Sequence, residues 1–242
     1  IPVYLSTQSS CINVETAKIW KKMGVQRIVL GREVSIEEAG KIKKGAGVEV
    51  EMFVHGAMCM GFSGHCLLSN FFQGRDSNRG ACCQACRFRY DLDYKERRFR
   101  NVTFLNSRDL NGMGCLSSFV LNEIDALKIE GRMKSPLYLA TLVKAYRQAL
   151  DAFQNDTSFI SEDVFKETDC IRHRPYTEGF LKDSQNLETV YYQETRDPEL
   201  YEFTGIVLQV LPSEGRQVVW IANPFLSTDE LEVLPFKGKS LP

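Results

Sequence analysis

Apolar residues in the first 150 positions follow two alternating patterns, one with a period of two and one with a helical period. Extended apolar segments are expected at residues 2–7, 26–31, 48–56, 102–106 and 126–130. Amphipathic helices are expected between them at residues 13–24 and 35–47, with a weakly patterned helix before residue 126 and a long helix opened by Ser135 and Pro136. Strands that alternate with amphipathic helices predict an α/β fold with a parallel sheet.

Local signals mark the ends of the first two helices. Asn13 can cap the first, and Gly24 can end it in a left-handed conformation. Ser35 followed three residues later by Glu38 is typical of a capping box, and the second helix is expected to close near Gly45 and Gly47.

The number of strands bears on the architecture. We count four or five, whereas a closed (β/α) barrel needs about eight. Residues 1–153 are therefore interpreted as the C-terminal part of a (β/α) TIM-type barrel, with the other strands expected upstream of Ile1. Residues 154–198 are expected to form a linker that wraps the barrel, because they are polar and weakly periodic.

The last segment changes character. Residues 199–242 contain short strand-like runs at 203–211, 216–222 and 230–234, separated by Pro, Gly and Asn-Pro turns. They predict a small all-β domain that is incomplete at Pro242.

Charge and composition leave several functional classes open. The 242 residues carry 30 basic and 31 acidic side chains, so a cationic surface for nucleic acid must be local. No apolar run reaches the length of about 18 residues that a membrane span needs. We expect a cytoplasmic protein without a membrane partner, and we found no secretory signal that would favour disulfides.

Cysteines provide the strongest chemical signal. Five of the eight lie within 28 residues: Cys59, Cys66, Cys82, Cys83 and Cys86. Several thiolates that converge on one point can hold an iron-sulfur cluster or zinc. The adjacent Cys82 and Cys83 are not expected to ligate together, since neighbouring side chains diverge. The alternative is that some are small buried apolar residues.

Polar residues on two predicted strands are candidates for catalysis. His55 and Glu51 share one face by strict alternation, and so do Lys128 and Glu130, with Arg132 just beyond. The alternatives are a histidine that stabilises the cysteine loop and an ion pair inside a barrel.

A cationic and aromatic stretch follows the cysteines. The candidate RNA-binding residues are Arg87, Arg89, Tyr90, Arg97, Arg98 and Arg100. Cations interleaved with aromatic rings can hold phosphates and stack an unpaired base. The alternative is a solvated loop, because three nearby carboxylates offset part of the charge.

Several long motifs resemble one known family. They are residues 51–59, 63–69, 74–80, 84–87, 105–110, 127–132, 174–180 and 229–234. The chain resembles the collagenase-like peptidases of family U32, and in particular their branch of RNA hydroxylation proteins. Protease signatures are absent from the sequence: there is no His-Glu-x-x-His motif, and His65 breaks the Gly-x-Ser-x-Gly pattern that starts at Gly61.

This resemblance implies a cofactor and its ligands. A 4Fe-4S cluster would be held by Cys59, Cys66, Cys82 and Cys86, with zinc as the alternative metal and with Cys83 or Cys115 as alternatives for the fourth ligand. It also implies prephenate as a co-substrate, and Arg87 and Arg132 are expected to bind the cofactor.

The resemblance also implies an activity. The expected reaction is hydroxylation of an RNA pyrimidine at carbon 5, first of the tRNA wobble uridine and second of ribosomal RNA. The alternatives are a metal-dependent collagenase-like peptidase and a non-catalytic iron-sulfur scaffold that binds a partner protein.

Overall fold

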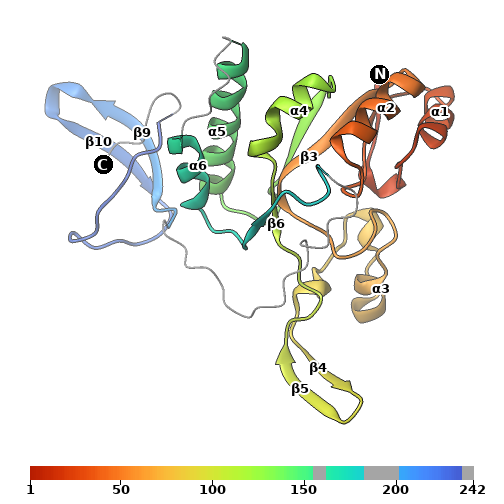
Figure 1. Cartoon of the computed structure of the whole chain (residues 1–242). Coiled ribbons are helices and arrows are strands. Elements are labelled where there is room, and N and C mark those ends of the chain that lie inside the picture. Colours follow the sequence, from red (N-terminus) through yellow and green to blue (C-terminus); the bar gives the residue numbers. More distant parts are fainter. Residues whose placement is uncertain (155–161, 183–201, 236–242) are drawn as a thin grey trace. The chain divides into compact units, whose positions relative to one another are not determined.

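A computed structural model describes residues 1–154, 162–182 and 202–235 (Figure 1). The described residues of 1–130 and 173–182 form one compact unit, and those of 131–172 and 202–235 form a second. Among the described residues, no helix has the length and apolar character to cross a bilayer.

The first unit is built on a six-stranded sheet. Its strands are β1 (Val3–Leu5), β2 (Val25–Val29), β3 (Glu49–Ala57), β6 (Asp109–Asn111), β7 (Ala126–Glu130) and β8 (Tyr176–Thr177). The pairs β1–β2, β2–β3, β3–β7 and β6–β8 are parallel, and β3–β6 is antiparallel. The predicted α/β class with a parallel sheet is confirmed. The described strands do not close into a barrel, so the TIM-type barrel stays a prediction.

Strand β3 is the centre of this sheet. Its first part pairs with β2 through Glu51 and Val29, and its last part pairs with β6 through His55 and Asn111. Both Glu51 and His55 also pair with β7, so β7 runs along one side of β3 while β2 and then β6 occupy the other. The buried face of β3 includes Val50, Met52 and Val54.

Helix α1 (Val14–Lys22) begins and ends as the sequence predicts. The Asn13 side chain accepts a hydrogen bond from the Thr16 N–H, and Gly24 has a φ of +93° just beyond the helix. The buried Ala17 marks the face that packs inward. Both end signals act over a few residues, which is why the pattern alone locates them.

Helix α2 (Ile36–Ala46) carries the predicted capping box. Ser35 accepts from the Glu38 N–H, and the Glu38 carboxylate accepts from the Ser35 N–H at 3.0 Å. Gly47 ends the helix with a φ of +64°, a conformation that favours glycine.

The predicted strand at residues 102–106 is wrong. The chain instead forms a hairpin of β4 (Tyr90–Tyr94) and β5 (Arg97–Val102), which Figure 1 shows as a two-stranded ribbon that projects from the first unit. Within the hairpin, the apolar Leu92 lies opposite Phe99. Beyond it, Phe104 packs its ring against Tyr90 instead of continuing a strand. Short helices α3 (Leu68–Gln73) and α4 (Leu116–Leu121) complete this unit.

The second unit contains the long predicted helix α5 (Pro136–Gln154) and a helix that was not predicted, α6 (Glu162–Asp169). The Lys144 ammonium on α5 lies 3.0 Å from the Glu167 carboxylate on α6. Of the segment interpreted as a linker, α6 and β8 are described, and residues 155–161 and 183–198 lie outside the described residues.

The last described segment forms an antiparallel hairpin. Strands β9 (Gly205–Leu211) and β10 (Arg216–Ile221) match the first two strands predicted for the tail. The third predicted strand, at residues 230–234, is represented only by an isolated bridge residue at Val233. Residues 199–201 and 236–242 of the predicted small domain lie outside the described part of the chain.

Candidate metal and RNA site

The first half of the cysteine loop follows β3 and is tied to the segments beside it. Ser63 is buried, its N–H donates to the Glu33 carboxylate at 2.6 Å, and its carbonyl accepts from the Ser10 hydroxyl. Gly64 has a φ of +79°, and a Cβ there would lie 2.2 Å from the Gln8 carbonyl oxygen. Residue 64 therefore has to be glycine, and the first half of the loop is held against the segment around Gln8.

In the second half of the loop, the two adjacent cysteines have different hydrogen-bond partners. The Cys83 N–H donates to the Ser69 hydroxyl at 3.1 Å, and the Cys83 sulfur lies 3.4 Å from the same hydroxyl. Cys82 is exposed, and its sulfur accepts from the Gln84 N–H. Gln84 has a φ of +60°, which turns the chain between Cys82 and Cys86.

None of the eight cysteines, all of which are described, forms a disulfide. Burial raises the pKa of the Cys86 thiol, Arg87 opposes that shift, and Cys59 and Cys82 add to it through their charges. Two of the other predicted ligands, Cys59 and Cys82, thus lie within electrostatic range of Cys86.

The donor set fits a thiolate-bound metal in its chemistry, because it consists of unpaired sulfur atoms on one loop. In the described parts of the chain, however, no three His, Cys, Asp or Glu side chains converge closely enough to hold a metal ion.

Two arginines lie beside these thiols. Arg174 donates to the Asp109 carboxylate from its Nε at 3.0 Å and to the Asn106 side-chain oxygen at 2.7 Å. Arg87 donates to Gln84 at 2.6 Å, but its Nε is buried without a hydrogen-bond partner. Burial and the charge of Arg174 lower the pKa of Arg87. A cation with an unused donor in a half-buried position can bind an anionic group.

Glu51 and Lys128, two of the candidate catalytic residues, form an ion pair. The Lys128 ammonium lies 3.2 Å from the Glu51 carboxylate, and Arg27 lies 3.6 Å from the same carboxylate. Glu51 is therefore flanked by two cations, which favours the structural alternative for this pair.

Glu130 is placed near them through Phe53. The Arg32 guanidinium stacks 3.6 Å from the centre of the Phe53 ring and lies 3.2 Å from the Glu130 carboxylate. The Lys128 ammonium lies 5.5 Å from the same ring. The structure thus brings Glu51, Lys128 and Glu130 together around Phe53, with Arg32 as an additional member.

His55 is fully buried and contacts a different partner. Its Nε2 lies 3.2 Å from the Tyr176 hydroxyl, and the Tyr176 ring stacks on His173 at 3.9 Å. The β3–β7 register shifts between Phe53 and His55. The strict alternation that predicts one shared face for Glu51 and His55 is therefore interrupted.

The hairpin β4–β5 divides its side chains between two faces. Tyr94 lies opposite Arg97 and Leu92 opposite Phe99, while the intervening pair is Asp93 and Arg98. Tyr94 and Phe99 are exposed. One face therefore carries aromatic rings with Arg97.

The other hairpin face carries ion pairs. Arg100 lies 3.0 Å from the Asp91 carboxylate, and Arg98 lies 3.8 Å from Asp93. Of the other candidate residues, Arg89 and Arg132 are exposed, and the Tyr90 hydroxyl donates to the Ala85 carbonyl. Tyr90 is thus held against the cysteine loop.

Comparison with known proteins identifies the family. The sequence model of peptidase family U32 matches residues 1–190. The chain belongs to peptidase family U32. No solved structure matches it.

Several relatives of this U32 chain have names that refer to RNA, and one, from Porphyromonas gingivalis, is named collagenase. It is 37% identical to the tRNA hydroxylation protein P1 of Bacillus subtilis over 96% of the chain and 57% of that protein. It is 31% identical to the tRNA hydroxylation protein P of Haemophilus influenzae over 98% of the chain and 63% of that protein. It is 36% identical to the 23S rRNA 5-hydroxycytidine C2501 synthase of Escherichia coli over 63% of the chain and 24% of that protein.

The U32 chain thus spans less than two thirds of the length of these relatives. Four residues to which the sequence alone assigns no role take part in the contacts of this site: Arg32, Glu33, Asp109 and Arg174. Arg32 and Glu33 lie in the loop after β2, and polar residues beyond the carboxyl end of a parallel strand were a signal that could have identified them.

Proposed function

We propose that this chain belongs to an enzyme that hydroxylates a pyrimidine of RNA at carbon 5. The favoured substrate is the wobble uridine of tRNA, with ribosomal RNA second, and the compartment is the cytoplasm. The observation that carries the proposal is the loop of free thiols beside Arg87, in a chain similar to proteins named for tRNA hydroxylation. The parallel strands would belong to a (β/α) barrel whose carboxyl edge carries the site.

In this proposal a 4Fe-4S cluster is held by Cys59, Cys66, Cys82 and Cys86, and it supplies one-electron chemistry when bound. Support comes from the electrostatic effect of Cys59 and Cys82 on Cys86 and from the absence of disulfides at all eight cysteines. The loop would close on the metal, as is usual where metal binding is coupled to local folding. The same thiols could hold zinc.

Arg87 and Arg132 are proposed to bind the co-substrate. Prephenate carries carboxylates, and a guanidinium can bind a carboxylate through two parallel hydrogen bonds. The unused Nε of Arg87 supports this role, since a buried donor without a partner is costly.

The test of the proposed function is a nucleoside profile. Total tRNA from a strain that lacks the gene is expected to lose 5-hydroxyuridine and its derivatives, and the wild-type gene should restore them. Mass spectrometry of digested tRNA and rRNA measures both substrates in one experiment. An unchanged profile, together with a loss of gelatin cleavage, would contradict the proposal and favour a peptidase.

The aromatic face of β4–β5 is proposed to contact single-stranded RNA together with Arg89. The candidates Arg98 and Arg100 lie on the opposite face, paired with Asp93 and Asp91, and are expected to contribute less. Replacing Arg97 by alanine is expected to weaken RNA binding and to lower the salt dependence of log K by about 0.7, the value for one lost phosphate contact. Arg98→Ala is the matched control, because Asp93 already offsets that cation. Fluorescence anisotropy at several salt concentrations measures both variants. Equal losses in the two would show that the faces do not differ.

A further inference from the structure

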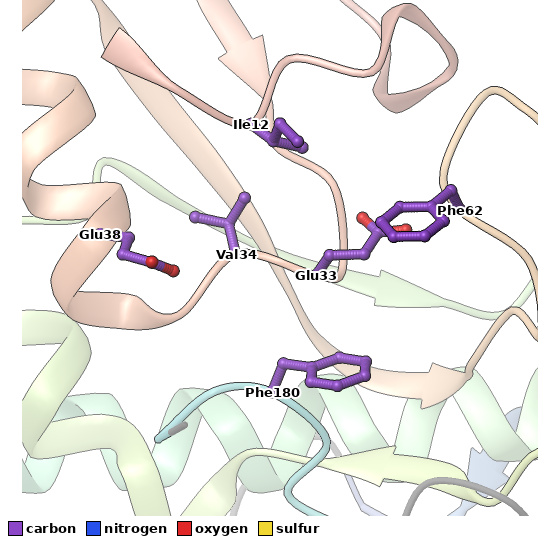
Figure 2. A pocket seen from close by; sticks show the side chains of 6 residues that line it. All are labelled: Ile12, Glu33, Val34, Glu38, Phe62 and Phe180. Carbon is purple, nitrogen blue, oxygen red and sulfur yellow. The ribbon is translucent and has the colours of Figure 1, made fainter. Parts of the chain in front are cut away.

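A pocket of about 330 Å³ lies at the carboxyl edge of the sheet in the first unit. Six side chains line it: Ile12, Glu33, Val34, Glu38, Phe62 and Phe180. Figure 2 shows Ile12 across from Phe180, with Glu38 at the end opposite Glu33 and Phe62. Glu33 and Phe62 follow β2 and β3, two parallel strands whose carboxyl ends meet at this edge, whereas Phe180 follows β8, which runs antiparallel to β3. This is the edge at which parallel sheets bind ligands.

The polarity of the pocket restricts what can bind there. The described residues that line it are apolar apart from two glutamates, and none of them is a cation. An anionic ligand such as a phosphate or a dicarboxylate would therefore be repelled. The volume is at the small end of the range for ligand pockets, about 300–1,000 Å³. A single neutral ring fits these limits better than a whole nucleotide.

The two glutamates differ in their hydrogen bonding. Glu38 accepts from the N–H and the hydroxyl of Ser35, both at 3.0 Å, so it is engaged in the helix cap. Glu33 accepts from the Ser63 N–H through Oε1, while its Oε2 is buried without a partner. Gly31 makes room for that oxygen, because a Cβ there would lie 2.3 Å from it.

An acceptor without a donor beside an apolar pocket favours a ligand that brings an N–H group. The last torsion of a glutamate side chain is soft, so a small rotation can turn the free oxygen toward such a donor. Phe62 is 65% exposed, which leaves its ring available for stacking.

We propose that this pocket receives an unpaired uracil-type base, stacked on Phe62 and Phe180, with its imide N–H donated to Glu33. The inference rests on the proposed function and names the base that the site selects. A base must leave its stack before it can be modified, and this pocket adjoins the loop of the proposed cluster ligands. Cytosine presents a ring acceptor where uracil presents this donor, so it leaves the carboxylate unsatisfied.

The test compares two short single-stranded RNAs that carry either one uridine or one N3-methyluridine, which lacks the imide proton. The whole protein is expected to bind the methylated RNA about tenfold more weakly, or worse, because Glu33 then has no donor. Glu33→Gln keeps the acceptor for Ser63 and replaces the free oxygen with a donor amide. This variant is expected to bind both RNAs with a ratio near one.

Two further variants sharpen the result. Glu38→Gln is the matched control at the other end of the pocket; it preserves the capping box and should keep the wild-type ratio. Phe62→Ala should weaken binding of both RNAs about tenfold through lost stacking. The loss of discrimination in Glu33→Gln, at unchanged melting temperature, separates a binding role from misfolding.

Several outcomes would overturn the inference. Equal binding of the two RNAs by the wild-type protein would do so, and so would discrimination that survives in Glu33→Gln. If n-butylamine displaces the bound uridine-containing RNA and free uridine does not, the pocket would be assigned to an aliphatic amine. The proposed function is judged separately: if the wild-type and Glu33→Gln genes both restore 5-hydroxyuridine, the function stands and the pocket assignment fails.

Discussion

Replacing any one of the four proposed cluster ligands by serine is expected to remove the iron and to abolish RNA hydroxylation. These residues are Cys59, Cys66, Cys82 and Cys86. A serine hydroxyl stays protonated where a thiolate is needed, so a cluster that depends on all four thiolates is lost. Iron and acid-labile sulfide, measured on anaerobically purified protein, quantify the cluster, and tRNA nucleoside analysis measures the activity.

Cys83→Ser is the sharpest control for this experiment. Cys83 is adjacent to Cys82 in the chain, but its sulfur faces the Ser69 hydroxyl at 3.4 Å. We expect this variant to keep its iron and its activity, and the same holds for Cys170→Ser on the second unit. If Cys83→Ser loses its iron and Cys86→Ser keeps it, the fourth ligand is Cys83 and not Cys86. Full iron content in all variants would exclude these thiols as ligands.

The parts of the fold that the sequence predicts are those determined by neighbouring residues. The cap at Asn13 and the capping box of Ser35 and Glu38 join groups three residues apart, so their spacing is visible in the chain. Strands β2, β3 and β7 follow from short segments of apolar or alternating residues for the same reason.

Features that depend on how strands pair with one another were missed. The hairpin β4–β5 has charged residues throughout, and its strand character comes from the opposite strand and not from burial. The register shift before His55 depends on β7, which lies more than 70 residues later. Alternation along one strand cannot reveal such a shift.

The candidate site divides in the same way. The thiols are close in sequence, so their clustering was evident, whereas Glu33 meets Ser63 across 30 residues and Arg174 meets Asp109 across 65. Long-range partners of this kind can be recognised only when the sheet is folded. These partners determine which hydrogen-bonding groups beside the cysteine loop remain without a partner.

The Arg174–Asp109 pair is expected to dominate the stability of the first unit. Asp109 is 1% exposed and Arg174 is 18% exposed. Arg174→Ala removes the guanidinium from the buried Asp109 carboxylate and leaves only the backbone N–H of residue 174 from this partner, so the free energy of unfolding should fall by about 3 kcal/mol, the lower end of the range for a broken buried pair. Chemical denaturation followed by circular dichroism measures the change. Lys41→Ala, which breaks the exposed pair with Glu37 on α2, should leave the unfolding midpoint nearly unchanged.

A double variant tests whether the charge itself is responsible. In Arg174→Met combined with Asp109→Leu neither charge remains, so the loss of stability should be smaller than in Arg174→Ala alone. Additive losses would instead indicate two independent packing defects. Arg87 and Arg174 are the two arginines beside the thiols, and the charge of Arg174 lowers the pKa of Arg87. Removal of Arg174 should therefore leave Arg87 as the remaining cation of the two. A folded double variant that binds iron but no longer hydroxylates RNA would connect the Arg174–Asp109 pair to co-substrate binding.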